Sequence, residues 1–149
     1  MNRNILQSFL SAFRGLWITY KSQRNFRIQV SFAILAIYFS IKFKIPPEHM
    51  LFVILSIVFV LISELINTSI EILGDRITKG KDLWIKNSKE ISAAEVLLSA
   101  VFSVIVGLVV FLPHIHKLTL SLIAISLIII IIPAIMRNDD IIKNERKER

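Results

Sequence analysis

Long apolar runs, separated by charged or proline-containing segments, dominate the pattern of this chain. Four of them approach the roughly 20 apolar residues that a helix needs to cross a bilayer. They cover residues 28–45, 50–73, 91–112 and 118–136. The pattern therefore predicts an all-α integral membrane protein, with three transmembrane helices within residues 28–112 and a further one within 113–136.

The first 27 residues follow a different pattern, because their apolar side chains recur at steps of one, three or four residues. This spacing places the side chains on one face of a helix. The face consists of Ile5, Leu6, Phe9, Leu10, Phe13, Leu16, Trp17 and Tyr20. We expect residues 1–27 to form an amphipathic helix on the inner membrane surface. Packing of the same helix against the chain's own spans is also compatible with the pattern.

Positive charge is concentrated in alternate segments between the runs. Fifteen of the 18 Lys and Arg residues lie before residue 28, in the loop 76–89 or in the tail 137–149. Because positively charged loops stay on the cytoplasmic side, we expect both termini, the loop and the charged tail to be cytoplasmic.

Composition narrows the possible chemistry. The chain has no cysteine, which excludes disulfides, thiol catalysis and cysteine zinc sites. Its four glycines leave little room for a glycine-rich phosphate loop. The net charge of +7 would suit nucleic acid or an anionic membrane surface. The apolar runs favour the membrane, and we expect no nucleic-acid partner.

The second apolar run carries three acids on one helical face. Glu64, Asn67, Glu71 and Asp75 fall within about 100° of arc and about 16 Å of helix length. A carboxylate inside a span costs several kcal/mol unless it faces protein, water or a cation. Mg²⁺, which takes one or two carboxylates together with substrate phosphates, would explain the cluster.

A simpler interpretation stays open for the acids near the helix end. Glu71 and Asp75 would then be solvated and paired with Arg76 or Lys79. For Glu64, which lies deeper in the apolar run, this interpretation is weaker.

Further polar groups open the third run. Lys89 and Glu90 lie where they could reach a phosphate held near the acids. Glu95 lies about one turn into the run, and it either extends the acidic site or reaches out to the membrane surface.

The spacing Glu64-x-x-Asn67-Thr-Ser-Ile-Glu71-x-x-x-Asp75, followed by Lys89-Glu90, resembles the small prokaryotic diacylglycerol kinase family. That family includes the undecaprenol kinases of Gram-positive bacteria. Gly15 and Asn25-Phe26-Arg27 are similar to its N-terminal region, and the resemblance covers roughly residues 9–113.

The resemblance implies a homotrimer of three-span subunits in the bacterial inner membrane, with active sites between neighbouring subunits. A lipid alcohol, diacylglycerol or undecaprenol, would enter from the bilayer. ATP with Mg²⁺ would bind at the cytoplasmic edge. Residues 28–112 would form the kinase core, to which 113–136 would add a helix.

The resemblance also implies roles for individual residues. Glu64 would be the catalytic base for the lipid hydroxyl, Glu71 would bind the metal, and Asn67 and Asp75 would organise the site. The implied nucleotide-binding residues are Glu71, Gly80, Lys81, Asp82, Lys89 and Glu90.

This chain departs from the family pattern at four places. Gln23 stands where the family has a second metal-binding glutamate; its amide oxygen can still ligate Mg²⁺ but carries no charge. Glu90 replaces the usual aspartate. Glu95 stands where the family prefers Gly or Ala, and our hypothesis is that it restores the missing carboxylate. Residues 113–136 have no counterpart in the family's three-span plan.

The expected function is ATP- and Mg²⁺-dependent phosphorylation of a membrane lipid alcohol. Two alternatives stay open at this stage. One is a catalytically weak or silent membrane subunit, which Gln23 and the fourth apolar run suggest. The other is an ion or proton-coupled transporter in which the acids line a path.

Overall fold

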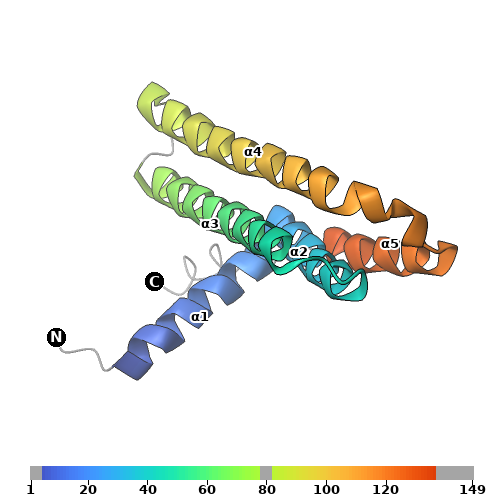
Figure 1. The fold of residues 1–149 in the computed structure, drawn as a ribbon. Helices are drawn as coiled ribbons and strands as arrows, with labels where there is room; N and C mark the ends of the chain where they lie inside the picture. The colour runs from blue at the N-terminus through green and yellow to red at the C-terminus, as the bar shows by residue number, and fades with distance from the viewer. Residues whose placement is uncertain (1–4, 78–81, 137–149) are drawn as a thin grey trace.

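A computed structural model describes residues 5–77 and 82–136 of the chain. Within these ranges every regular element is helical, which confirms the predicted all-α class. The elements are α1 (Ile5–Ser22), α2 (Arg24–Lys42), α3 (Pro47–Ile77), α4 (Leu83–Phe111), the 3₁₀ helix η1 (Leu112–Lys117) and α5 (Leu120–Ile135) (Figure 1).

Two elements of the described chain are long and apolar enough to cross a membrane. They are Pro47–Ile77 and Leu83–Lys117, which contain the second and third apolar runs. The helix α5 has 16 residues, which corresponds to about 24 Å, less than the roughly 30 Å of a bilayer core. The helix α2 is not among the candidate spans, and its polar side chains lower its hydropathy. The first and fourth predicted spans therefore remain predictions.

The loop between α2 and α3 is shaped by its backbone. Lys44 has a φ of 54°, the left-handed conformation that commonly ends a helix. The N–H of Ile45 reaches back to the carbonyl of Ser40 at 2.9 Å, which satisfies one of the last carbonyls of α2. Pro47 then begins α3, where the N–H that proline lacks would have no helical partner.

Helix α3 is the central element of the molecule. It lies beside α4 along much of its length and also contacts α2, whereas α5 packs against α2 (Figure 1). An apolar cluster of Phe43, Ile45, Val53 and Val110 joins the end of α2, the start of α3 and the end of α4. This cluster lies near the start of α3, whereas the polar residues Glu64, Asn67, Glu71 and Asp75 lie in the second half of the helix.

Helix α1 extends away from the other helices (Figure 1). Its side chains Ile5, Phe9 and Phe13 are 78%, 62% and 67% exposed, so they do not pack against the described spans. This exposure favours the interpretation of α1 as a helix at a membrane surface, which remains a prediction.

The side chain of Arg27 joins three helices. It is 1% exposed, and its Nε and Nη2 donate to the carbonyls of Pro133 (2.9 Å) and Met136 (2.7 Å) at the end of α5. Its Nη1 donates to the carbonyls of Tyr20 and Lys21 at the end of α1, both at 3.2 Å. The last carbonyls of a helix lack intrahelical donors and carry the negative end of its dipole. One guanidinium therefore caps α1 and α5 and fixes both to α2.

Replacing Arg27 by lysine is expected to destabilise the fold by about 1–3 kcal/mol, because part-buried carbonyls of two helix ends lose a charged donor. Lysine keeps the charge but has no planar fork able to reach two helix ends. Thermal unfolding in detergent measures the effect. Arg24→Lys is the control, since Arg24 is an exposed arginine of the same helix. Equal unfolding temperatures for the two variants would contradict the role of Arg27.

Candidate functional site

The carboxylate of Glu64 lies between α3 and α2. Glu64 is 2% exposed, and its Oε2 accepts a hydrogen bond of 2.9 Å from Nε2 of Gln29. A buried charge needs such a donor to offset its lost hydration. The sequence analysis did not select Gln29, although a glutamine within an apolar run indicates a side chain that needs a buried polar partner.

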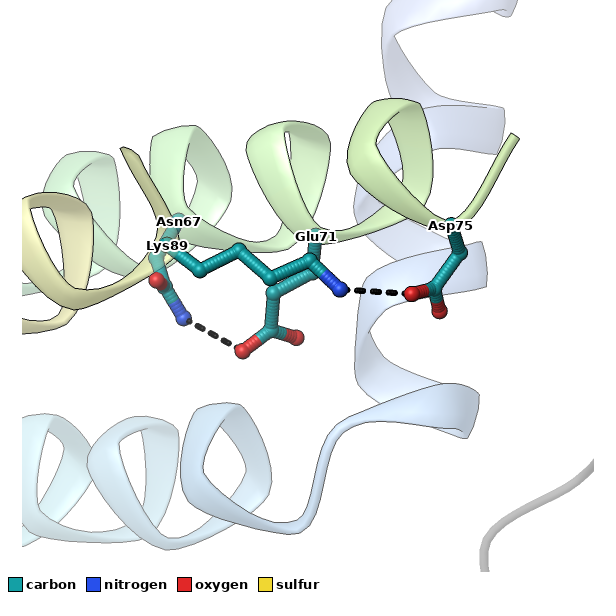
Figure 2. Close-up of polar contacts among 4 residues, drawn as sticks. All are labelled: Asn67, Glu71, Asp75 and Lys89. Carbon is teal, nitrogen blue, oxygen red and sulfur yellow. Dashed lines mark hydrogen bonds and ion pairs between the residues drawn. The ribbon is translucent and has the colours of Figure 1, made fainter. Parts of the chain in front are cut away.

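A chain of hydrogen bonds runs from α4 to Glu71. The hydroxyl of Ser92 donates to Oδ1 of Asn67 at 2.7 Å, and Nδ2 of Asn67 donates to Oε1 of Glu71 at 3.2 Å. Figure 2 shows the second of these bonds, with the carboxylate of Glu71 beside the amide of Asn67. Asn67 and Ser92 are buried, whereas Glu71 is half-buried. The Asn67 amide thus holds one oxygen of a partly accessible carboxylate.

Asp75 and Lys89 link the ends of α3 and α4 that the loop connects. Their Oδ1 and Nζ atoms are 2.5 Å apart (Figure 2). The simpler interpretation of the sequence paired Asp75 within its own helix, but this ion pair joins two helices. Lys79, the other partner considered, lies outside the described residues.

Lys89 reaches Asp75 by crossing the backbone of α3 at Gly74. A Cβ on Gly74 would lie 2.7 Å from Cε of Lys89 and 2.9 Å from Cγ2 of Ile85. The absence of a side chain at Gly74 therefore provides the space for this path.

The remaining predicted residues of α4 have local contacts. Oδ1 of Asp82 accepts from the backbone N–H groups of Trp84 (2.8 Å) and Ile85 (3.1 Å), which caps the start of the helix. Glu90 forms an ion pair of 3.6 Å with Lys86, and both side chains are largely exposed. Asp82 is therefore the N-cap of α4, and Glu90 faces solvent.

The other predicted residues lie apart from these contacts. Gln23 is the N-cap of α2, where its side chain makes no capping bond. Glu95 is exposed on α4. No described contact joins either residue to Glu71. Gly80 and Lys81 fall outside the described residues.

The donor set can be compared with the needs of a metal ion. Among residues 5–77 and 82–136 there is no group of three or more His, Cys, Asp or Glu side chains arranged to hold a metal. Glu71 offers a carboxylate whose Oε2 has no hydrogen-bond partner in those ranges. This set fits Mg²⁺ bound largely through substrate phosphates and water, rather than a closed protein cage.

Glu64 and Glu71 on α3 and Lys89 on α4 thus lie on two adjacent helices that are long and apolar enough to cross a membrane. Sequence similarity to known proteins identifies the class of protein. The chain belongs to the prokaryotic diacylglycerol kinase family, whose model, "Prokaryotic diacylglycerol kinase", matches residues 10–111. The resemblance seen in the sequence is confirmed, and the protein is a lipid kinase. The match ends with α4, so η1 and α5 lie beyond it.

Two curated relatives support this assignment. The chain is 36% identical over 115 residues to the undecaprenol kinase of Bacillus subtilis, an alignment covering 76% of this chain and 91% of the relative. It is 32% identical over 117 residues to the diacylglycerol kinase of a Synechocystis strain, covering 77% of this chain and 66% of that protein.

Proposed function

We propose that the protein transfers the γ-phosphate of ATP to the hydroxyl of a membrane lipid alcohol, undecaprenol or diacylglycerol, with Mg²⁺ as cofactor. The observation that carries this proposal is the polar face of α3. Glu64, Asn67, Glu71 and Asp75 extend along it over about 16 Å. Glu64 is buried against α2, whereas Asp75 is exposed beside Lys89. Such a face would let a lipid from the bilayer meet a nucleotide from the cytoplasm.

Glu64 is the proposed base. Gln29 binds its Oε2, which orients the carboxylate and leaves Oε1 for the lipid hydroxyl. Accepting the hydroxyl proton would make the alcohol oxygen a better nucleophile toward the γ-phosphate. The position of the acid within a span suits a hydroxyl that arrives at the level of the lipid headgroups.

Glu71 and Lys89 are proposed to act on the phosphates. Bound Mg²⁺ would neutralise charge on the phosphate oxygens during transfer. Glu71 would hold it through its accessible oxygen, and Gln23 is proposed as a second ligand. Lys89, positioned by Asp75, would place an ammonium beside the phosphates. Further proposed nucleotide contacts come from Gly80, Lys81, Asp82 and Glu90, and a supporting role is proposed for Glu95.

The assembly and location are part of the same proposal. We infer a homotrimer in the bacterial inner membrane, with both termini in the cytoplasm, the orientation that the distribution of Lys and Arg favours. Residues 28–112 would form the kinase core, and α1 would lie on the inner leaflet. The helix α5 would be an additional helix after the three spans of that core.

The direct test uses purified, reconstituted protein with γ-labelled ATP. Label is expected in the extracted lipid when Mg²⁺ and a lipid alcohol are both present, and not when EDTA replaces Mg²⁺. We expect undecaprenol to be the better substrate than diacylglycerol, because the relative at 36% identity is an undecaprenol kinase. The absence of labelled lipid with either alcohol would contradict the proposal.

Gly74→Ala is expected to raise the KM for ATP several-fold and to lower the unfolding temperature, because the added Cβ would meet Cγ2 of Ile85 as well as Lys89. The added Cβ displaces the flexible end of Lys89 and thereby its ammonium. The exposed ion pair with Asp75 contributes only about 0–1 kcal/mol to stability, so its loss adds little to the destabilisation. Steady-state kinetics at varied ATP measure the effect. Gly107→Ala is the control, because a Cβ there meets no atom within 4 Å. An unchanged KM in Gly74→Ala would contradict the proposed role of Lys89.

A further inference from the structure

We propose that Ser92 is a positioning residue that fixes the amide of Asn67 and, through it, the carboxylate of Glu71. This inference rests on the proposed function, since it concerns the residue assigned to hold Mg²⁺. It adds to the site a residue on α4 that the motif on α3 does not contain.

The first step in the argument is the direction of the hydrogen bonds. An ionised carboxylate only accepts hydrogen bonds, so Glu71 requires the NH₂ side of the Asn67 amide. The opposite side, Oδ1, then points to Ser92, whose hydroxyl donates to it at 2.7 Å. Turning the amide over would place Oδ1 against Oε1 of Glu71. Ser92 and Glu71 therefore favour the same amide orientation from its two sides.

The second step is burial. Ser92 and Asn67 are 2% and 9% exposed, so bulk water does not readily replace the serine hydroxyl. Without that donor, Oδ1 of Asn67 would be left unsatisfied between α3 and α4, and the amide would lose the contact that sets its orientation.

The third step is the contrast with other serines of the same helix. The hydroxyls of Ser88 and Ser99 donate to carbonyls of their own helix, those of Trp84 and Val96. Ser92 has the same option, since its Oγ lies 2.9 Å from the carbonyl of Lys89. It nevertheless makes its shorter contact to a side chain on α3. The Ser92 hydroxyl could be satisfied by the carbonyl of Lys89 alone. Its contact with Oδ1 of Asn67 is needed only to hold the Asn67 amide in place.

The consequence is a Glu71 carboxylate with one fixed oxygen and one accessible oxygen. Asn67 binds Oε1, which leaves Oε2 available to a cation. Loss of Ser92 should therefore weaken metal binding, even though its hydroxyl does not contact Glu71 in the described structure.

The test measures Mn²⁺ affinity by electron paramagnetic resonance in the presence of a non-hydrolysable ATP analogue and without lipid, together with kcat. Ser92→Ala is expected to weaken Mn²⁺ binding by about 3- to 10-fold, the effect of one lost hydrogen bond. Ser99→Ala is the matched control, expected to leave affinity and kcat unchanged. A Ser92→Ala affinity within 2-fold of wild type would overturn the inference.

A double-mutant cycle separates positioning from a general effect on packing. If Ser92 acts through Asn67, Ser92→Ala should reduce affinity by less than 2-fold in the Asn67→Ala background. Full additivity of the two losses would overturn the inference. If Ser92→Ala does not fold, Ser92→Cys replaces it in the same double-mutant cycle. Cysteine is close to serine in size, but its S–H group is a weaker hydrogen-bond donor.

The single variants distinguish failure of this inference from failure of the proposed function. Weak Mn²⁺ binding in Asn67→Ala with wild-type binding in Ser92→Ala overturns the role of Ser92 alone. Wild-type binding in both Asn67→Ala and Glu71→Gln overturns the proposed metal site and the role of Ser92 with it.

Discussion

Glu64→Gln is expected to abolish lipid phosphorylation while leaving the protein folded. General base catalysis contributes about 10²–10⁴-fold, so turnover should fall by at least about 10²-fold. Glutamine has nearly the same size, and its amide oxygen can still accept the hydrogen bond from Gln29. The change therefore removes the proton acceptor without opening a cavity. Transfer of labelled phosphate to lipid, measured beside thermal unfolding in detergent, provides the test.

The control for this experiment is Glu48→Gln. Glu48 is an exposed acid in the first turn of the same helix, at the end away from the polar face. It should keep wild-type turnover. If Glu64→Gln also retains near-native turnover, Glu64 is not the base.

Glu71→Gln is the second large expected effect, with activity reduced by about 10²-fold or more and a higher Mg²⁺ concentration needed for half-maximal rate. The substitution removes the charge that a cation would need, and metal assistance contributes several kcal/mol to phosphate chemistry. The new amide oxygen can still accept from Asn67, so the hydrogen-bond chain from Ser92 can persist. A Mg²⁺ titration of the rate at fixed ATP measures the loss.

The same titration on Glu48→Gln controls for a general change in charge. A half-maximal Mg²⁺ concentration equal to that of wild type in Glu71→Gln would show that another group holds the metal.

The polar face of α3 could be predicted from the sequence because helical periodicity alone aligns its members. Residues 64, 67, 71 and 75 differ by three or four positions, and these steps return to one side of any α-helix. The structure confirms this segment as part of a candidate membrane span, Pro47–Ile77. The function class could be predicted too, because the same spacing resembles that of the family to which the chain belongs.

The contacts made by that face could not be predicted, because they depend on how the helices are rotated against one another. Glutamine at 29 and serine at 92 are polar residues in apolar surroundings, but periodicity within α2 or α4 does not say that they meet Glu64 and Asn67. The capping of α1 and α5 by Arg27 likewise depends on helix ends that are distant in sequence.

The length of the helix within the fourth apolar run was also not evident from composition. Residues 118–136 read as one apolar stretch, but Thr119 has an extended backbone (φ −99°, ψ 158°) and α5 begins only at Leu120. Pro133 stands inside α5 and removes one backbone donor near its end. A run of apolar residues therefore overestimated the length of the helix.

The most direct test of the central claim, that Glu71 on the polar face of α3 holds the metal of a nucleotide complex, is a titration of the protein with Mn²⁺ and a non-hydrolysable ATP analogue, followed by electron paramagnetic resonance. We expect saturable binding to wild type and to Glu48→Gln, and its loss in Glu71→Gln. Equal Mn²⁺–nucleotide binding in all three proteins would contradict the claim.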